Sequence, residues 1–231
     1  MRDERSIWTK QGEFKVKYSR QFVKDEWVND LSHLLRHIPL SDFTIREEFE
    51  RKLAEYCDCK YAIAVNSGST AIMIGMKVID RKAKVVVGPN YGNIAWVNCS
   101  RFLDLYPHAI DIRKDNFCLD EEILEQRLSS AADRIHSVVY INHAGYTGEQ
   151  LNKVAEICRK YNIYLLEDSC NALGQWYEGK HAGLTGDIGF LSFGVPKLIS
   201  CGEGGAILTN SRILYESCKA LVYHGGWYDS N

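Results

Sequence analysis

Residues 136–168, HSVVYINHAGYTGEQLNKVAEICRKYNIYLLED, decide the fold class of this chain. The segments at 136–142 and 162–168 are short apolar runs, which is typical of strands that are buried on both faces. Between them, residues 148–161 place apolar side chains at helical spacing, so an amphipathic helix is predicted there. Strands that alternate with helices in this way indicate a mostly parallel sheet with helices on both faces.

The same alternation extends over the rest of the chain. Further strands are predicted at 61–65, 84–88, 108–112, 187–193 and 205–210. Further helices are predicted at 43–57, at 71–79, at 96–102, from Asp120 onward, and through Leu214, Cys218 and Leu221. Thr44 and Glu47 have the spacing of a capping box at the start of the first helix. The predicted fold class is therefore α/β, a three-layer, mostly parallel sheet, with a leader segment at 1–42 and one large domain at 43–231.

The composition is that of an ordinary globular protein without a charge bias. The 231 residues are 45% hydrophobic and 25% charged, and 28 basic against 30 acidic side chains give a net charge of −2. This balance provides no electrostatic footprint for nucleic acid or for an acidic membrane surface. No apolar run approaches the ~20 residues that cross a bilayer, and residues 1–20 lack the apolar stretch of a signal peptide. The expected location is the cytoplasm.

Eight cysteines raise the alternatives of disulfides or a bound metal. No two of them form a Cys-x-x-Cys pair, and only Cys57 and Cys59 are close in sequence. Zinc sites ordinarily need two such pairs, or cysteines near histidines, at characteristic spacing. In a cytosolic chain we expect the eight to be reduced and mostly buried thiols, and we predict no metal site.

Small and hydroxylated residues follow the strand at 61–65. The turn NSGST, residues 66–70, leads directly into a predicted helix. Small side chains let the backbone approach an anion, and a helix N-terminus presents free N–H groups and a partial positive charge. Gly68, Ser69 and Thr70 are therefore candidate phosphate contacts. The alternative is an ordinary turn with a Ser or Thr cap, and the chain has neither a Walker loop nor a GxGxxG fingerprint there.

Three more side chains lie at or just after strand ends. Asp168 ends the strand at 162–168, where a carboxylate either caps the next turn or pairs with a buried cation. Ser192, near the end of the strand at 187–193, offers a hydroxyl to an anion, and Lys197 follows in a glycine-bounded loop. Pyridoxal 5'-phosphate (PLP) needs all of these, because it requires phosphate donors, an acid beside its ring nitrogen and a lysine for its aldehyde.

These motifs resemble the DegT/DnrJ/EryC1/StrS family, the PLP-dependent sugar aminotransferases of fold type I. The resemblance runs from about Phe43 to His224. Its most specific element is SFGVPKLISCGEGG (192–205), which is similar to the family's S-F-x-x-x-K…GEGG block. That similarity implies that Lys197 is the Schiff-base lysine and that Ser192 contacts the phosphate.

Two further motifs extend the resemblance. LEDSCNALG (166–174) is similar to the family's E-D-x-x-Q-x-x-G, which implies that Asp168 pairs with the ring nitrogen and that Asn171 lies near the ring hydroxyl. VNSGSTA (65–71) resembles the family's phosphate turn, which implies phosphate contacts for Gly68, Ser69 and Thr70.

Two positions depart from the family's pattern. In PNYGN (89–93), Asn93 falls where the family has the aromatic residue that stacks on the cofactor ring, while Tyr91 keeps an earlier aromatic. Asn171 replaces a glutamine and is shorter by one methylene. A branch of sugar dehydratases carries histidine at the lysine position, and Lys197 argues against membership of that branch.

The resemblance implies an aminotransferase that moves an amino group from glutamate or glutamine to a keto group of a nucleotide-linked sugar. In that reaction Lys197, once free of the cofactor, acts as general base and acid, and Asp168 keeps the ring nitrogen protonated. Glu203 is either a catalytic acid or a loop carboxylate. His143 and His181 are predicted to be ordinary loop residues.

The family ordinarily continues past VYHGG (222–226) into a smaller C-terminal domain, whereas this chain ends at Asn231. We therefore expect a homodimer, or a hetero-oligomer in which a second polypeptide supplies that part. The alternatives are a non-catalytic subunit that pairs with a complete aminotransferase, and another fold type I reaction such as that of a lyase. Mixing the protein with a donor amino acid separates an enzyme from a non-catalytic subunit.

Overall fold

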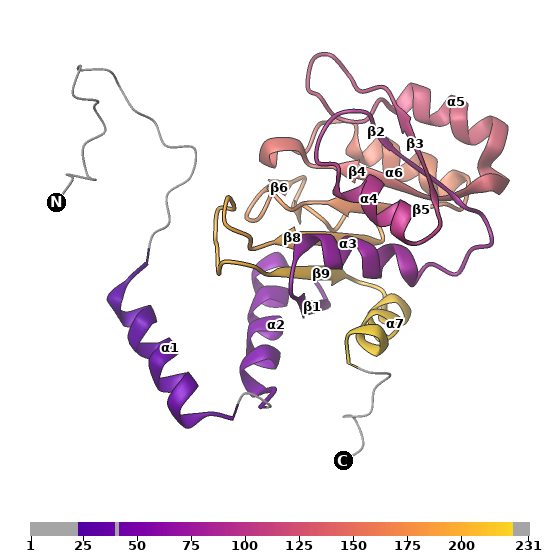
Figure 1. Ribbon diagram of the computed structural model, residues 1–231. Coiled ribbons are helices and arrows are strands. Elements are labelled where there is room, and N and C mark those ends of the chain that lie inside the picture. The colour runs from indigo at the N-terminus through magenta and orange to yellow at the C-terminus, as the bar shows by residue number, and fades with distance from the viewer. Residues whose placement is uncertain (1–22, 40–41, 224–231) are drawn as a thin grey trace, which may run out of the picture.

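The apolar runs of the sequence form a seven-stranded sheet in the order β1-β9-β8-β5-β4-β2-β3. The computed structural model describes residues 23–39 and 42–223, and Figure 1 shows this sheet between two layers of helices. The strands are β1 (Tyr61–Val65), β2 (Val85–Pro89), β3 (Tyr106–Ile110), β4 (Ile135–Ile141), β5 (Tyr164–Asp168), β8 (Ile188–Ser192) and β9 (Gly205–Thr209). A separate hairpin pairs β6 (Trp176–Tyr177) with β7 (Lys180–His181).

The sheet is mostly parallel, as the sequence predicts. Strands β3, β2, β4, β5 and β8 pair in parallel, whereas β9 runs antiparallel to both of its neighbours, β1 and β8. All strands except β9 therefore point the same way, and their carboxyl ends lie at one edge of the sheet. Ligands of open α/β sheets bind at that edge, in the loops that follow the strands.

Each face of the sheet carries its own apolar layer. The helices are α1 (Asp25–His37), α2 (Thr44–Cys57), α3 (Gly68–Lys77), α4 (Ala95–Phe102), α5 (Glu121–Ala131), α6 (Leu151–Lys160) and α7 (Arg212–Val222). Val139 and Ile141 of β4 pack in the same core as α3, α4 and α7, while Val138 and Tyr140 pack with α5 and α6. Leu53 of α2 packs on the second face, beside β1 and β8. The three-layer prediction is confirmed.

The start of α2 differs from the prediction. Thr44 is the first helical residue and not the cap, so the capping box predicted from Thr44 and Glu47 is wrong. Instead, the carboxylate of Asp42 accepts hydrogen bonds from the Thr44 backbone N–H at 2.8 Å and from its hydroxyl at 2.7 Å. A short polar side chain two residues before a free N–H satisfies it as well as the predicted box does.

Two elements were not predicted from the sequence. Helix α1 lies within the leader segment and stands apart from the sheet in Figure 1, with no buried residue. The β6–β7 hairpin is only two residues long on each side, too short for a periodicity signal. It buries His181, whose Nε2 accepts the Gly174 N–H at 2.9 Å. The prediction that His181 is an ordinary loop residue is therefore wrong.

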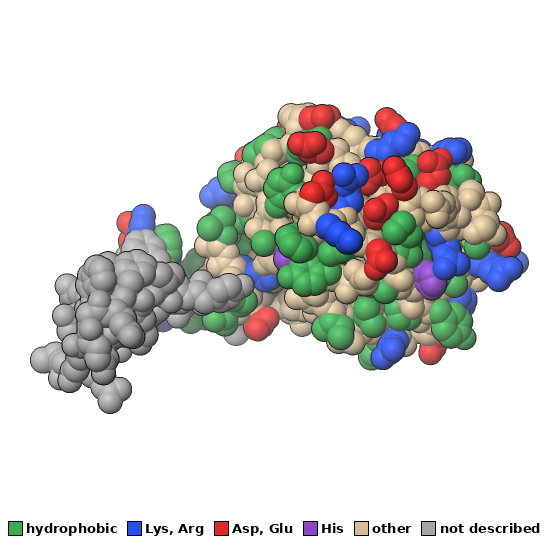
Figure 2. Space-filling view, turned by 90° about the horizontal axis from the view of Figure 1, so that it is seen from above, with side chains coloured by type: hydrophobic (Ala, Val, Ile, Leu, Met, Phe, Trp, Pro, Cys, Tyr) green, Lys and Arg blue, Asp and Glu red, His purple; other side chains and the backbone are tan. Residues whose placement is uncertain are grey.

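On the face drawn in Figure 2, acidic and basic side chains are intermixed, with hydrophobic side chains between them. In the described part of the chain, no helix is both long enough and apolar enough to span a bilayer. The same residues contain no cluster of three or more metal-ligating side chains. All eight cysteines are free thiols, and five of them are buried.

Acid should destabilise the fold through His136 on β4. This histidine is 3% exposed, and burial lowers its pKa to about 4 from an ordinary value of 6.5. As the pH falls, the unfolded chain binds a proton at this histidine at a higher pH than the folded protein does. The contribution of His136 to the free energy of unfolding is therefore complete above pH 6.5 and is lost as the pH falls toward 4. One pKa unit corresponds to about 1.4 kcal/mol, so after allowance for solvent screening we expect a loss on the order of 2 kcal/mol.

Urea unfolding between pH 7 and pH 4 measures this loss. His136→Gln should flatten the slope, whereas His33→Gln on the exposed face of α1 should leave it as in the wild type. Equal slopes for the wild type and His136→Gln would contradict the assignment.

Candidate active site

The loops after β1, β2, β4, β5 and β8 begin at one edge of the sheet, and every site residue that the sequence predicts lies in these loops or at the strand ends that lead into them. The turn after β1 enters α3, whose first residues are Gly68, Ser69 and Thr70. Ser67 caps this helix, because its hydroxyl accepts the Thr70 N–H at 3.1 Å and lies 2.9 Å from the Thr70 hydroxyl. The first-turn N–H groups of Gly68 and Ser69 have no acceptor within the helix, so they remain available to an anion.

Gly68 is the point at which three of these loops meet. A Cβ atom built on Gly68 would lie 2.9 Å from Cys170 Sγ and 2.9 Å from Ser192 Cβ. The phosphate turn, the loop after β5 and the end of β8 are therefore in direct contact there. Ser192 Oγ would be 3.3 Å from the same Cβ, which places its hydroxyl beside the N-terminus of α3. Only glycine allows this close approach.

Asp168 is a buried acid at the carboxyl end of β5. It is 3% exposed, and its Oδ1 accepts the Cys170 N–H at 3.1 Å. Burial raises the pKa of its carboxyl group, while hydrogen bonds from Cys170 and the positive charge of Lys197 act in the opposite direction. A buried carboxylate costs free energy unless a cation or several donors compensate it. The Asp168 carboxylate can therefore accept a hydrogen bond from a cationic N–H group.

Lys197 lies on the same side of the site. Its Nζ donates to Asn171 Oδ1 at 2.8 Å, and its backbone N–H donates to the Gly194 carbonyl at 3.0 Å. Asn171 follows Asp168 by three residues, so the lysine reaches the loop that carries the buried acid. Lys197 and Asp168 therefore lie on the same side of the site, close enough for the lysine charge to oppose the rise that burial causes in the pKa of the carboxyl group.

Asn93 has a role that the sequence did not indicate. Its Oδ1 accepts the Ala95 N–H at 2.8 Å at the start of α4, and the residue is exposed. The aromatic ring in this turn belongs to Tyr91, which is 49% exposed and packs against His143 with ring centroids 4.8 Å apart. His143 follows the end of β4, so this aromatic pair lies at the same edge of the sheet as Asp168.

A buried polar network supports the loop after β5, and sequence reasoning missed its role. Glu167 is fully buried, and its carboxylate accepts the N–H groups of Gly183, at 2.9 Å, and Gly186. Asn142 donates to Ser169 Oγ at 2.7 Å and, more weakly, to Glu167 at 3.4 Å. Burial raises the pKa of Glu167 against these donors. The sequence did offer a signal for this role. Neighbouring strand residues point to opposite faces of the sheet, so Glu167, which precedes Asp168, must bury its carboxylate on the other face and needs hydrogen-bond donors there.

These residues fit PLP on two observations. Within the described part of the chain, the direct hydrogen-bond donors to Asp168 come from Cys170, which leaves the carboxylate free to accept the ring N–H. The N-terminus of α3 and the Ser192 hydroxyl lie side by side, because a Cβ built on Gly68 would come within 3.3 Å of Ser192 Oγ. Helix N-termini of this kind bind phosphate.

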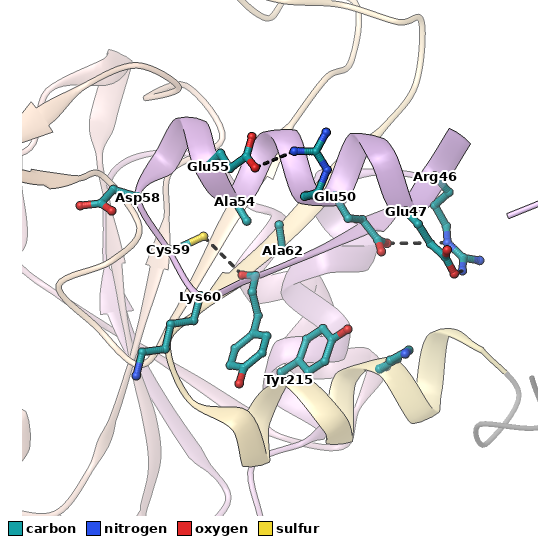
Figure 3. Close-up of a pocket in the computed structure, with 13 residues that line it drawn as sticks. Arg46, Glu47, Glu50, Ala54, Glu55, Asp58, Cys59, Lys60, Ala62 and Tyr215 are labelled. Carbon is teal, nitrogen blue, oxygen red and sulfur yellow. Dashed lines mark hydrogen bonds and ion pairs between the residues drawn. The ribbon is translucent and has the colours of Figure 1, made fainter. Parts of the chain in front are cut away.

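A second hollow lies away from this edge. A groove of about 600 Å³ runs between α2 and α7 along the free edge of β1, and Figure 3 shows its lining residues. Its walls mix acids with bases, including Glu50 and Lys60. Glu50 accepts the Ala64 N–H at 2.8 Å and the Tyr223 hydroxyl at 2.5 Å, so it covers the open strand edge. Such covering protects an edge strand from pairing with other chains, and we assign the groove no catalytic role.

Gly205 fixes the phosphate turn from behind, and we expect Gly205→Ala to displace it. A Cβ there would lie 2.5 Å from the Ser67 carbonyl group and 2.7 Å from the Gly68 nitrogen, and both are backbone atoms. The strain should lower the free energy of unfolding by about 1–3 kcal/mol and weaken PLP binding. Urea unfolding and a PLP titration measure the two effects.

Gly194→Ala provides the control, because its methyl group would meet nothing closer than 3.6 Å. Its stability should stay within about 0.5 kcal/mol of the wild type. If Gly205→Ala has the same free energy of unfolding as Gly194→Ala, the backbone of the turn at Ser67 and Gly68 can move away from the added methyl group without cost.

Comparison with known proteins identifies the family. The model of the DegT/DnrJ/EryC1/StrS aminotransferase family matches residues 23–230. The chain belongs to this family. The match begins 20 residues before Phe43, where the sequence motifs start, and so includes helix α1. Members of the family depend on PLP, so the predicted cofactor and the predicted fold class are those of the family.

Several relatives are named sugar aminotransferases. The chain is 30% identical to UDP-4-amino-4,6-dideoxy-N-acetyl-beta-L-altrosamine transaminase of Campylobacter jejuni over 210 residues. These residues make up 91% of this chain and 55% of that protein. It is 28% identical to GDP-perosamine synthase of Escherichia coli O157:H7, over 79% of this chain and 51% of that protein.

A solved structure confirms the fold. PseC of Helicobacter pylori, an aminotransferase involved in the biosynthesis of pseudoaminic acid, superposes with a TM-score of 0.83 at 26% identity. The superposition covers 90% of this chain and 56% of that one. The chain therefore spans about half the length of the family members that it matches, the part that forms the large domain.

Proposed function

We propose that this chain is the PLP-binding large domain of an aminotransferase that transfers an amino group to a keto group on a nucleotide-linked sugar. The observation that carries the proposal is the convergence of the α3 N-terminus, Asp168, Ser192 and Lys197 at one edge of the sheet. The names of the relatives support the substrate class, because they include a transaminase for a UDP-linked amino sugar and a GDP-perosamine synthase.

Each residue has one task in this proposal. The first turn of α3 and the Ser192 hydroxyl bind the phosphate group and fix the depth of the cofactor. Asp168 accepts the ring N–H and, because it is buried, holds that proton strongly. Lys197 anchors the cofactor covalently and, when released, carries a proton to and from the substrate carbon. PLP itself supplies the electron sink for the carbanion.

The amino donor that we propose is glutamate or glutamine, and the expected location is the cytoplasm. We propose that complete activity requires a dimer and a region equivalent to the remaining half of the relatives' length. A non-catalytic subunit is the second candidate function. The observation that favours it is Asn93, whose amide caps α4 where the family has a stacking aromatic ring.

Titration with PLP, followed by a donor amino acid, tests the proposal. The protein with PLP should develop a visible absorption band, and glutamate or glutamine should bleach that band with release of the keto acid. A visible band that no amino donor bleaches, alone or with a C-terminal aminotransferase domain added, would favour the non-catalytic subunit. Failure to develop the band would remove the PLP site altogether.

A further inference from the structure

Lys197 rests against an uncharged partner. Its Nζ donates to the amide oxygen of Asn171 at 2.8 Å; among the described residues no carboxylate lies within ion-pair distance of it, and the buried carboxyl group of Asp168 interacts with its charge from farther away. A lysine that has only to carry a surface charge gains more from a carboxylate than from an amide. The choice of a neutral acceptor for this side chain therefore calls for an explanation.

The loop fixes the backbone of Lys197 but not its amine. Its backbone N–H bonds to the Gly194 carbonyl, and the Cys201 N–H bonds to the Phe193 carbonyl at 3.0 Å. Between these bonds the loop is open, and Leu198 is 83% exposed. Four rotatable bonds separate the fixed backbone from Nζ, so the contact with Asn171 determines where the amine rests.

Asn171 is suited to hold that position. The Ala172 N–H bonds to the Ser169 carbonyl at 2.9 Å, which closes the turn that carries Asn171. Gly145 has a φ of +86°, and a Cβ on it would lie 2.9 Å from the Asn171 carbonyl oxygen, so the loop after β4 packs directly on this backbone. The Asn171 side chain is exposed apart from its bond to the lysine, so substitutions there should cost the fold little.

We propose that Asn171 is a positioning residue for Lys197, which holds the amine toward the cofactor and stabilises its charge less than a carboxylate would. An amide oxygen accepts from an ammonium and from a neutral amine, and it favours the ammonium less than a carboxylate does. A carboxylate at the same place would favour the ammonium, since an opposite charge within ~4–6 Å shifts a proton equilibrium by about 1–3 units. The inference rests on the proposed function, since it concerns how Lys197 becomes ready to react.

The reaction requires the neutral amine. An ammonium must first release a proton to solvent, and then the Nζ lone pair forms a C–N bond with the aldehyde carbon of PLP. The aldehyde oxygen leaves as water with the two remaining amine protons, and a C=N double bond results. No oxidant or reductant takes part, so the pH at which the amine loses its proton controls the rate.

The experiment measures covalent attachment of PLP as a function of pH. Wild type, Asn171→Asp, Asn171→Ala and Asn171→Gln are mixed with PLP between pH 6 and pH 10, trapped with borohydride, and analysed by peptide mass spectrometry at Lys197. Asn98→Asp, on the exposed surface of α4, is the control for an added negative charge.

We expect the midpoint of the pH profile to move upward by about one unit or more in Asn171→Asp, with about tenfold slower attachment at pH 7. Asn171→Ala should be slower across the whole range, and Asn171→Gln, which keeps the amide, should stay within about threefold of the wild type. Thermal unfolding of the proteins without PLP should be the same for all of them.

Coincident profiles for Asn171→Asp and Asn98→Asp would overturn this inference and leave the proposed function intact. A wild type that forms no adduct at any pH would instead remove the proposed function, and this inference with it. The two failures are therefore distinguishable.

Discussion

Lys197→Ala should abolish covalent attachment of PLP and lower transamination by about 10²–10⁴-fold, the range that a positioned acid–base group contributes. The lysine both anchors the cofactor and carries the proton, so no neighbouring group replaces it. Its hydrogen bond to Asn171 and its effect on the pKa of Asp168 bring it to the loop that follows the buried acid. The visible band and the rate of keto-acid release measure the two losses.

Lys82→Ala is the matched control, because Lys82 is exposed in the loop before β2, at the opposite end of the sheet from the site. It should keep the band and the rate. PLP should still bind Lys197→Ala through its phosphate, since the α3 N-terminus and Ser192 are unchanged. An unchanged visible band in Lys197→Ala would show that another amine holds the cofactor.

The layered fold was predictable because its strands are short apolar runs that alternate with helices of clear periodicity. The two antiparallel pairings of β9 were not predictable, since an apolar run buried on both faces looks the same in either direction. Helix α1 was missed for a different reason. Its apolar residues, such as Trp27 and Leu31, are exposed, so this helix has no buried face that connects it to the core of the sheet.

The site was predictable as far as side chains at strand ends reveal it. Asp168 and Ser192 lie at the ends of predicted strands and Lys197 follows one, and parallel strands bring their carboxyl ends to one edge. The hydrogen bond between Lys197 and Asn171 was not predictable, because it depends on how the loop after β8 folds back over the loop after β5. The hydrogen bond from the Ala95 N–H to Asn93 was not predictable either, because it depends on where α4 begins, whereas the resemblance to the family indicates only that a stacking aromatic ring is replaced at this position.

Asp168→Asn should separate stability from catalysis. The substitution keeps the shape of the side chain and removes a charge that burial disfavours, as the raised pKa of the carboxyl group indicates. We therefore expect the protein without PLP to be as stable as the wild type or more stable, by up to about 1 kcal/mol. An amide cannot keep the ring nitrogen protonated, so transamination should fall by about 10²–10⁴-fold while PLP still attaches to Lys197.

Thermal unfolding without PLP, borohydride trapping and keto-acid release measure these three outcomes on one preparation. Asp80→Asn, an exposed substitution that removes the same charge, should change none of them. A marked drop in Tm together with lost trapping would make Asp168 a structural residue whose carboxylate supports the turn at Cys170. Full activity in Asp168→Asn would show that the ring nitrogen needs no acid in this protein. A partnership between the buried acid and the cofactor requires that Asp168→Asn keeps its Tm, still attaches PLP to Lys197 and releases keto acid slowly.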